Sequence, residues 1–177
     1  MPSFLAAARG LPAGVTLRAE VDADRDFLAD LYASVREEEV RPVPWSDEQK
    51  RAFLREQFEL QRAHYRKHYP RAEWLLFEAE GAAAGRLYLH TGSAEVRLMD
   101  IALVAARRNR GVGTALTASI LRYADELALP VTLHVEPFNP ALRLYERFGF
   151  RTIETRGIYL FMKRPCPPPA TPSGATT

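Results

Sequence analysis

Cysteine, net charge and long apolar runs are all scarce in this 177-residue chain. The single cysteine, Cys166, cannot form an internal disulfide, which fits a reducing compartment, and we expect a cytoplasmic protein. A formal net charge of only +2 gives no overall attraction to nucleic acid or to anionic lipid. No apolar run approaches the ~20 residues that span a bilayer, and the N-terminus does not resemble a signal peptide. We therefore expect neither export nor membrane insertion.

The composition predicts one folded domain with two irregular ends. Hydrophobic residues make up 47% of the chain, enough for a sizeable single core. We expect residues 1–14 to be flexible and residues 15–164 to form the domain. Residues 165–177 are rich in proline, alanine and threonine and have too little apolar surface to fold, so we expect a disordered tail there.

The hydrophobic pattern alternates between extended and helical segments. Period-two runs bounded by turn residues predict strands at 15–20, 74–79, 86–91, 95–104, 131–136, 151–155 and 158–163. Apolar faces at helical spacing predict helices over about 24–35, 46–69, 112–127 and 139–149. The fold class is therefore α/β (α+β): a mixed, largely antiparallel sheet flanked by helices in a single domain.

A basic, glycine-containing loop joins the strand at 95–104 to the helix that follows it. The first N–H groups of a helix lack internal partners, and the helix dipole places about half a positive charge there. A phosphate group is thus a suitable ligand for this loop, although an ordinary tight turn is the alternative reading. The loop consists of Arg108, Asn109, Arg110, Gly111, Val112, Gly113 and Thr114.

Two motifs in the correct order resemble those of a known superfamily. Arg108-x-x-Gly111-x-Gly113, after a strand and opening a helix, resembles the acyl-CoA signature of the GCN5-related N-acetyltransferases (GNAT). The segment from Asn139 through Tyr145 to Gly149-Phe150 resembles the second motif of that superfamily. The resemblance extends over about residues 15–163 and implies the GNAT fold.

The resemblance implies acetyl-CoA as cosubstrate and assigns its contacts. The loop from Arg108 to Thr114 would bind the pyrophosphate. The main chain of Ile101, Ala102 and Leu103 would pair with the pantetheine arm, and an N–H near Leu103 would polarise the thioester carbonyl. Asn139 would cap its helix and touch the cofactor.

The catalytic residues are assigned by position. Tyr145 could be a core tyrosine, but the resemblance implies a general acid that protonates the departing thiolate. His134 and Glu136 lie on one side of the preceding strand, and His134 is suited to relay a proton near neutrality; a solvated polar face is the alternative. Asp100 is a second candidate for the base, unless it simply pairs with an arginine.

The helix predicted at 46–69 has an unusually polar inner stripe. Together with the segment before it, this helix would line the acceptor pocket. His64 and His68 are one turn apart, but no third ligand accompanies them, so we expect no metal. The predicted acceptor residues are Trp45, Gln57, Gln61, His64 and Tyr65.

The sequence thus predicts an N-acetyltransferase that transfers an acetyl group directly from acetyl-CoA to an amine. The acceptor is a small-molecule amine or a peptide amine, and a homodimer is possible on the resemblance. A non-catalytic acyl-CoA sensor with the same fold is the first alternative. A nucleic-acid-binding module is the second, disfavoured by the near-zero net charge.

Overall fold

The computed structural model describes residues 2–167 and contains one seven-stranded sheet. The strand order is β1-β2-β3-β4-β5-β7-β6, and every neighbouring pair is antiparallel except β4 and β5, which are parallel. This confirms the predicted mixed, largely antiparallel sheet. The strands are β1 (Val15–Ala19), β2 (Glu73–Ala79), β3 (Ala82–Thr91), β4 (Val96–Leu103), β5 (Val131–Val135), β6 (Arg151–Arg156) and β7 (Tyr159–Arg164).

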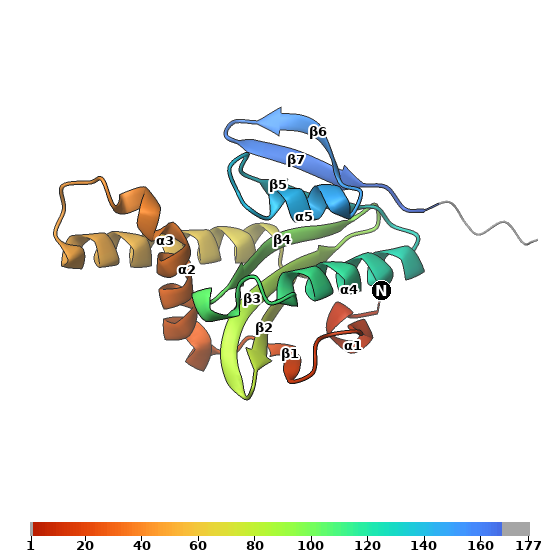
Figure 1. Ribbon diagram of the computed structural model, residues 1–177, viewed down its shortest axis with the longest axis horizontal. Helices are drawn as coiled ribbons and strands as arrows, with labels where there is room; N and C mark the ends of the chain where they lie inside the picture. The colour runs from red at the N-terminus through yellow and green to blue at the C-terminus, as the bar shows by residue number, and fades with distance from the viewer. Residues whose placement is uncertain (1, 168–177) are drawn as a thin grey trace, which may run out of the picture.

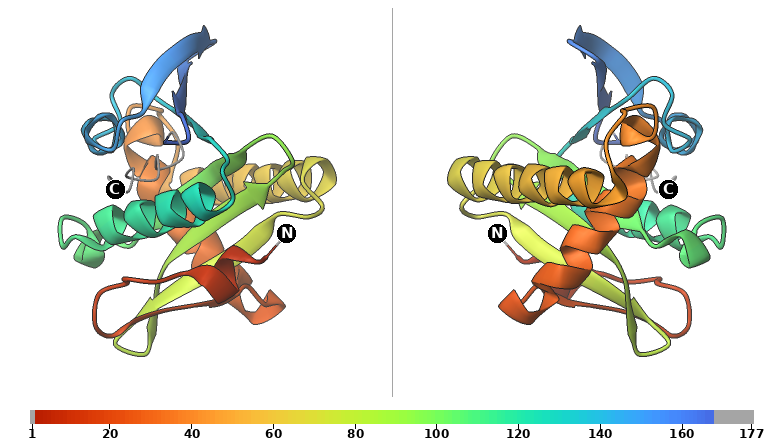
Figure 2. Two further views of the ribbon diagram at one scale, coloured as in Figure 1. Left: turned by 90° about the vertical axis from the view of Figure 1, so that its right-hand side faces the viewer. Right: turned by 90° about the vertical axis from the view of Figure 1, so that its left-hand side faces the viewer.

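Helices cover both faces of the sheet (Figure 1). The two views of Figure 2 show α4 in front of the strands from one side and α3 in front of them from the other. Within residues 2–167, no helix is long and apolar enough to cross a membrane. The helices are α1 (Phe4–Ala7), α2 (Arg25–Val40), α3 (Asp47–His68), α4 (Val112–Glu126) and α5 (Leu142–Arg147), with short 3-10 turns η1 (Asp22–Asp24) and η2 (Ala105–Arg107).

Two apolar clusters hold the layers together. The larger cluster lies between the sheet and α4, where Leu87 and Leu98 pack with Leu116 and Ile120. The smaller cluster packs α2 and α3 on the opposite face of β2, around residues such as Phe58. Because each face of the sheet buries apolar surface against its own helices, the central strands form a fixed scaffold for loops at their ends.

The pairing between β4 and β5 covers only the first part of β4. It ends at Leu98 opposite Leu133. The register with β3 shifts at the same point, since Tyr88 faces Asp100 but Leu89 faces Leu98, which leaves Met99 as a bulge. A bulge bends a strand and increases its local twist. From residue 99 onward β4 therefore has one edge paired with β3 and one edge free.

A capping box starts α3 as the sequence predicts. Ser46 N donates to Gln49 Oε1 at 2.9 Å, and Gln49 N donates to Ser46 Oγ at 3.2 Å. This reciprocal pair satisfies donors that the first turn of a helix leaves without partners. The helix continues to His68, and its N-terminal half extends beyond the sheet (Figure 1).

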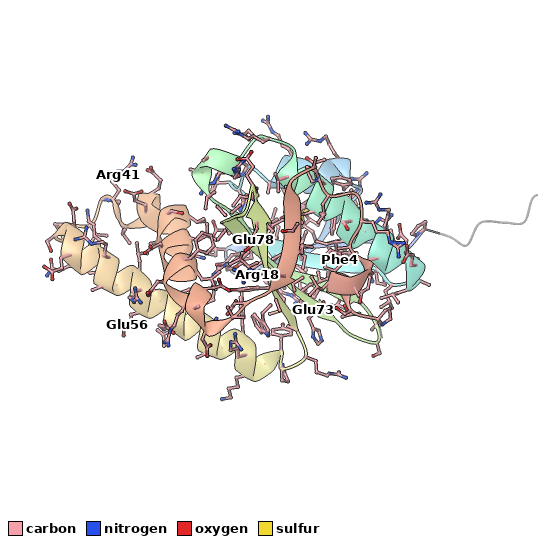
Figure 3. All side chains as sticks on the ribbon, turned by 90° about the horizontal axis from the view of Figure 1, so that it is seen from below. Phe4, Arg18, Arg41, Glu56, Glu73 and Glu78 are labelled. Atoms are coloured by element: carbon pink, nitrogen blue, oxygen red, sulfur yellow. The ribbon has the colours of Figure 1, made fainter. Side chains whose placement is uncertain are left out.

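The N-terminal segment is packed on the domain, in contrast to the predicted flexibility. Phe4 is fully buried and its ring packs against Tyr123. The Glu73 carboxylate accepts from Phe4 N at 2.6 Å and Leu5 N at 2.9 Å. Phe4 and Glu73 are labelled in Figure 3. The prediction is thus wrong for this segment, because apolar side chains and a carboxylate at a helix start hold it. Of the predicted tail, residues 168–177 lie outside the described part.

Candidate functional site

The start of α4 presents main-chain donors without acceptors. Gly111 is its N-cap at φ 79°, and no side chain caps the helix. Ala115 N is the first amide of the helix to find a carbonyl, at 2.9 Å from Gly111 O. The N–H groups of residues 112–114 have no acceptor among the described residues. Such a row of free donors, at the positive end of a helix dipole, is suited to bind an anion.

The arginines of this loop differ in their availability. Arg107 is engaged, since its Nη2 lies 2.6 Å from Glu80 Oε2, and this pairing lowers the pKa of the Glu80 carboxyl. Arg108 Nε donates to the carbonyl of Leu103 at 3.1 Å and links the loop to the end of β4. Arg110 makes no ion pair with any described residue. Arg110 and the two Nη groups of Arg108, which makes no ion pair with a described residue either, are therefore available to meet an anion.

The free edge of β4 exposes main-chain groups of alternate residues. Val104 N donates to Ala84 O at 2.9 Å, and Ala102 lies opposite Arg86 in the β3 ladder. Because successive residues direct their N–H and C=O groups to opposite edges, Ile101 and Leu103 face the free edge, whereas Ala102 faces β3. The main-chain groups of Ile101 and Leu103 are therefore accessible to a ligand, whereas those of Ala102 are directed to β3, and the contacts with a pantetheine arm stay predictions.

Tyr145 and Asn139 belong to the segment that forms α5. Asn139 Oδ1 accepts from Ala141 N at 2.9 Å, in the turn that leads into α5, whose N-cap is Ala141. Tyr145 is only 6% exposed, its ring packs edge-on against Phe150, and its hydroxyl has no hydrogen bond with a described residue. Burial, followed by the nearby Asp100 carboxylate, raises the pKa of Tyr145. The hydroxyl therefore keeps its proton near neutrality, which suits an acid and not a base.

The two predicted base residues have different settings. His134 is exposed on β5 and stacks on Phe161, with ring centroids 4.7 Å apart. Partial burial, then the charges of Arg97 and Arg156, lower the pKa of His134 and favour the neutral imidazole. The strand ends at Val135, so the alternation that placed Glu136 on the same side as His134 does not extend to it. His134 therefore starts in the neutral form that a proton acceptor requires.

Arg86, which the sequence analysis did not single out, forms a buried ion pair with Asp100 on the α3 face of the sheet. Arg86 is 3% exposed, and its Nη2 donates to Asp100 Oδ2 at 2.5 Å and to Gln61 Oε1 at 3.1 Å. The rings of Tyr32 and Tyr88 lie against the guanidinium, which is 5.8 and 5.1 Å from their centroids. One signal in the sequence was an arginine inside the apolar strand β3. The alternative reading of Asp100, pairing with an arginine, is confirmed.

Two of the five predicted acceptor residues reach this ion pair. Gln61 does so through the hydrogen bond to Arg86. Tyr65 is partly buried near it, and burial, followed by the charge of Asp100, raises the pKa of Tyr65 to about 12. The C-terminal half of α3 therefore faces the same region as Asp100.

The other three acceptor residues are not brought to the pair. Trp45 packs against Phe53 near the start of α3, with centroids 5.3 Å apart. His64 is exposed and lies beside the His68 ring at 4.2 Å. Gln57 is partly buried and makes no side-chain hydrogen bond with a described residue. Gln57 and His64 lie on α3, whereas Trp45 precedes the helix, at the end remote from Gln61 and Tyr65.

The hollows on the α2–α3 surface do not coincide with these residues. Two open hollows of about 390 and 360 Å³ lie between α2 and α3, both lined by Ala33 and Arg51 and neither by a predicted site residue. Nor do the described residues hold a group of three side chains suited to a metal. The candidate site is thus the region where β4 and β5 separate, beside the start of α4.

This arrangement agrees with a family comparison. The model of the acetyltransferase (GNAT) family matches residues 28–150, which include β4, the loop, α4 and Tyr145. The chain belongs to the GNAT acetyltransferase family. No curated relative matches the chain.

Solved GNAT structures share the fold at low sequence identity. The PaiA N-acetyltransferase from Thermoplasma acidophilum, in complex with coenzyme A, has 16% identity and a TM-score of 0.65, covering 85% of this chain and 98% of its own. The ribosomal-protein-S18-alanine N-acetyltransferase from Escherichia coli has 19% identity and a TM-score of 0.56, covering 85% and 93%. A histone acetyltransferase HPA2-related protein from Corynebacterium glutamicum has 22% identity and a TM-score of 0.61, covering 89% and 99%. These likenesses establish the shared fold.

Proposed function

We propose that the protein is an N-acetyltransferase that transfers the acetyl group of acetyl-CoA directly to a primary amine. The observation that carries the proposal is the junction of two sets of unpartnered main-chain groups. The free N–H groups at the start of α4 adjoin the free edge of β4, where the sheet opens between β4 and β5. An anionic, amide-containing ligand such as a CoA ester complements both sets.

Different residues at this junction would bind different parts of the ligand. The amides of residues 112–114 and the Arg110 side chain would hold the pyrophosphate. The main chain of Ile101 and Leu103 would pair with the pantetheine amides, as a peptide pairs with a sheet edge. The Leu103 N–H would polarise the thioester carbonyl.

The reaction forms one bond and breaks one bond. The amine nitrogen bonds to the acetyl carbon, and the carbon–sulfur bond breaks to give an amide and a thiolate. Tyr145 gives its proton to the sulfur, and the amine loses a proton to His134, directly or through water. Proton return from His134 to Tyr145 through solvent restores both residues. The raised pKa of Tyr145 keeps its hydroxyl protonated and the lowered pKa of His134 keeps its imidazole neutral, which are the starting states that these roles require.

The acceptor must react as a neutral amine. At pH 7 a lysine side chain must lose a proton at a cost of roughly 4 kcal/mol, whereas an α-amine costs a little over ~1 kcal/mol. The proposed base, His134, is a single exposed histidine, which supports the acceptor with the lower deprotonation cost, the α-amine. We therefore propose a peptide α-amine as the favoured acceptor and a small-molecule amine as the second, because an aliphatic amine such as phenethylamine has the same deprotonation cost as lysine.

The test is a measurement of acetylated product. The protein is incubated with acetyl-CoA and either phenethylamine or the tripeptide Ala-Ala-Ala, and released thiol and product mass are followed. N-acetylated Ala-Ala-Ala serves as the control because its amine is blocked. Enzyme-dependent acetylation of at least one free amine is expected. Acetyl-CoA binding without product from either amine would favour a sensor and contradict the proposal.

A further inference from the structure

The buried ion pair of Arg86 and Asp100 joins β3 to β4, and its bonding pattern also indicates a role in the candidate site. Arg86 uses only Nη2 for Asp100 and Gln61, while its Nε and Nη1 are buried and have no partner among the described residues. Burying a cation this incompletely satisfied is costly unless a nearby anion compensates it. Asp100 is the carboxylate that supplies this compensation.

Asp100 is held by one oxygen and keeps the other available. Only Oδ2 accepts a hydrogen bond from a described residue, and the side chain remains 18% exposed. Asp100 also follows Met99 at the bulge, where β4 leaves β5. The free oxygen Oδ1 is thus on a strand that borders the opening of the sheet.

The influence of Asp100 reaches both sides of that opening. Its charge raises the pKa of Tyr65 on α3 and that of Tyr145 on α5, with burial as the larger cause in each case. The carboxylate therefore lies between the predicted acceptor side and the predicted thiol side. The ionisable groups that interact directly with the pair are Tyr88 on β3, Tyr32 on α2, Tyr65 on α3 and Tyr145 on α5. The charged or ionisable groups beside these tyrosines are Glu20, Arg36, Glu39 and Tyr159.

A carboxylate beside an acceptor amine has two opposing effects. It orients the amine by accepting an N–H hydrogen bond, but a full negative charge also stabilises the ammonium form, typically by 1–3 pKa units. Only the neutral amine can attack the acetyl carbon. A cation fixed against the far oxygen removes most of the second effect and keeps the first.

We propose that Asp100 Oδ1 orients the acceptor amine, and that Arg86 neutralises this carboxylate so that the amine is not held as an ammonium ion. Asp100 is then a substrate-binding residue, and Arg86 is a positioning residue that acts through it. The inference rests on the proposed function and names the group that meets the acceptor.

Three variants test the charge balance: Arg86→Gln, Asp100→Asn and the double variant. For each protein kcat is measured against pH at saturating acceptor, using whichever of phenethylamine or Ala-Ala-Ala the wild type acetylates, because this profile reports the bound amine. Arg86→Gln leaves the charge of Asp100 unbalanced, so the rising limb should move to higher pH by about one unit, a tenfold fall in kcat at pH 7. Asp100→Asn should move the limb to lower pH and raise KM about tenfold, the loss of one charged hydrogen bond.

The double variant separates charge balance from structural damage. The rising limb of its kcat–pH profile should return close to the wild-type position, because both the positive and the negative charge have been removed. If Arg86 has a purely structural role, the rising limb of Arg86→Gln should stay at the wild-type pH, and the kcat of the double variant should be no higher than that of either single variant. This result would overturn the inference. An unchanged KM for Asp100→Asn would also overturn it.

Folding and the proposed function are checked separately. Acetyl-CoA should raise the melting temperature of each variant as it does for the wild type, which shows that the fold and cosubstrate site are intact. If Arg86→Gln does not fold, the direction of the Asp100→Asn shift and its KM decide the question alone. A wild type that acetylates neither amine would refute the proposed function, and the inference with it, whereas an active wild type with unmoved limbs would refute only the inference.

Discussion

The candidate site has two halves that are constructed differently. The cofactor half consists of the free edge of β4 and the start of α4, and it offers main-chain groups from one continuous segment, residues 101–114. The acceptor half consists of side chains from separate elements, among them Asp100, Arg86, Tyr65 and His134. A main-chain site depends on local geometry and little on side-chain identity, whereas the acceptor half can change by single substitutions. One fold can therefore keep its cosubstrate and change its acceptor.

The largest effect is expected where the two halves meet, at Tyr145. The Tyr145→Phe variant keeps the ring that packs against Phe150 and loses only the hydroxyl. General acid catalysis contributes at least about 100-fold, so kcat should fall by about that factor. Acetyl-CoA binding, measured as the increase in melting temperature that the ligand causes, should not change. Full activity of this variant would show that another group protonates the thiolate.

The next effect should isolate the cofactor half. A Cβ at Gly113 would meet nothing nearer than Leu144 Cδ2, at 3.9 Å, so Gly113→Ala should fold normally. The methyl group would stand where the pyrophosphate approaches, and acetyl-CoA affinity should fall at least tenfold, about 1.4 kcal/mol. Isothermal titration calorimetry gives the affinity directly.

Gly111→Ala is the matched control for that variant. Gly111 has φ 79°, a left-handed conformation that costs an L-residue about 1–2 kcal/mol. This variant should lower the free energy of unfolding in urea without any ligand present. Equal stability losses for Gly111→Ala and Gly113→Ala would mean that both glycines serve the turn alone.

A smaller effect is expected in the acceptor half, at His134. The neutral imidazole is the active form, and its lowered pKa should keep it neutral to below about pH 6.5. Activity through this residue should be lost only as pH falls through that lowered value. His134→Gln should reduce kcat at pH 7 about tenfold and remove the additional loss of activity at low pH, below the limb of the bound amine, measured by initial rates between pH 5 and 8. An unaltered profile would assign the proton to water or to another group.

The smallest effect should come from the far end of α3. Trp45 is 41% exposed and packs against Phe53, away from the Arg86–Asp100 pair. Trp45→Ala should leave kcat and KM for a small amine nearly unchanged in steady-state assays. A large rise in KM for Ala-Ala-Ala alone would instead extend the acceptor half along α3, as a longer peptide acceptor requires.

The sequence predicted the elements that form the proposed cofactor half better than the side-chain contacts near α3, for a physical reason. Alternating apolar residues, the capping box at Ser46 and the glycines of the loop are local signals, and they predicted the sheet, α3 and α4. Arg86 meets Asp100 only through the register of two strands, and it meets Gln61 only through the packing of α3 on the sheet. Burial of Phe4 likewise depends on Glu73, far along the chain. Such contacts leave no periodic signal in one sequence.

Thermal unfolding of the wild type with and without acetyl-CoA, beside Gly113→Ala, tests the central claim most directly. Ligand at a hundredfold excess over its Kd adds about 2.7 kcal/mol, or roughly 5 to 10 °C for a domain of this size. The account predicts a shift of this size in the wild type and a much smaller one in the variant at the same concentration. No shift in the wild type at millimolar acetyl-CoA would contradict the assignment of the loop and the β4 edge to this cosubstrate.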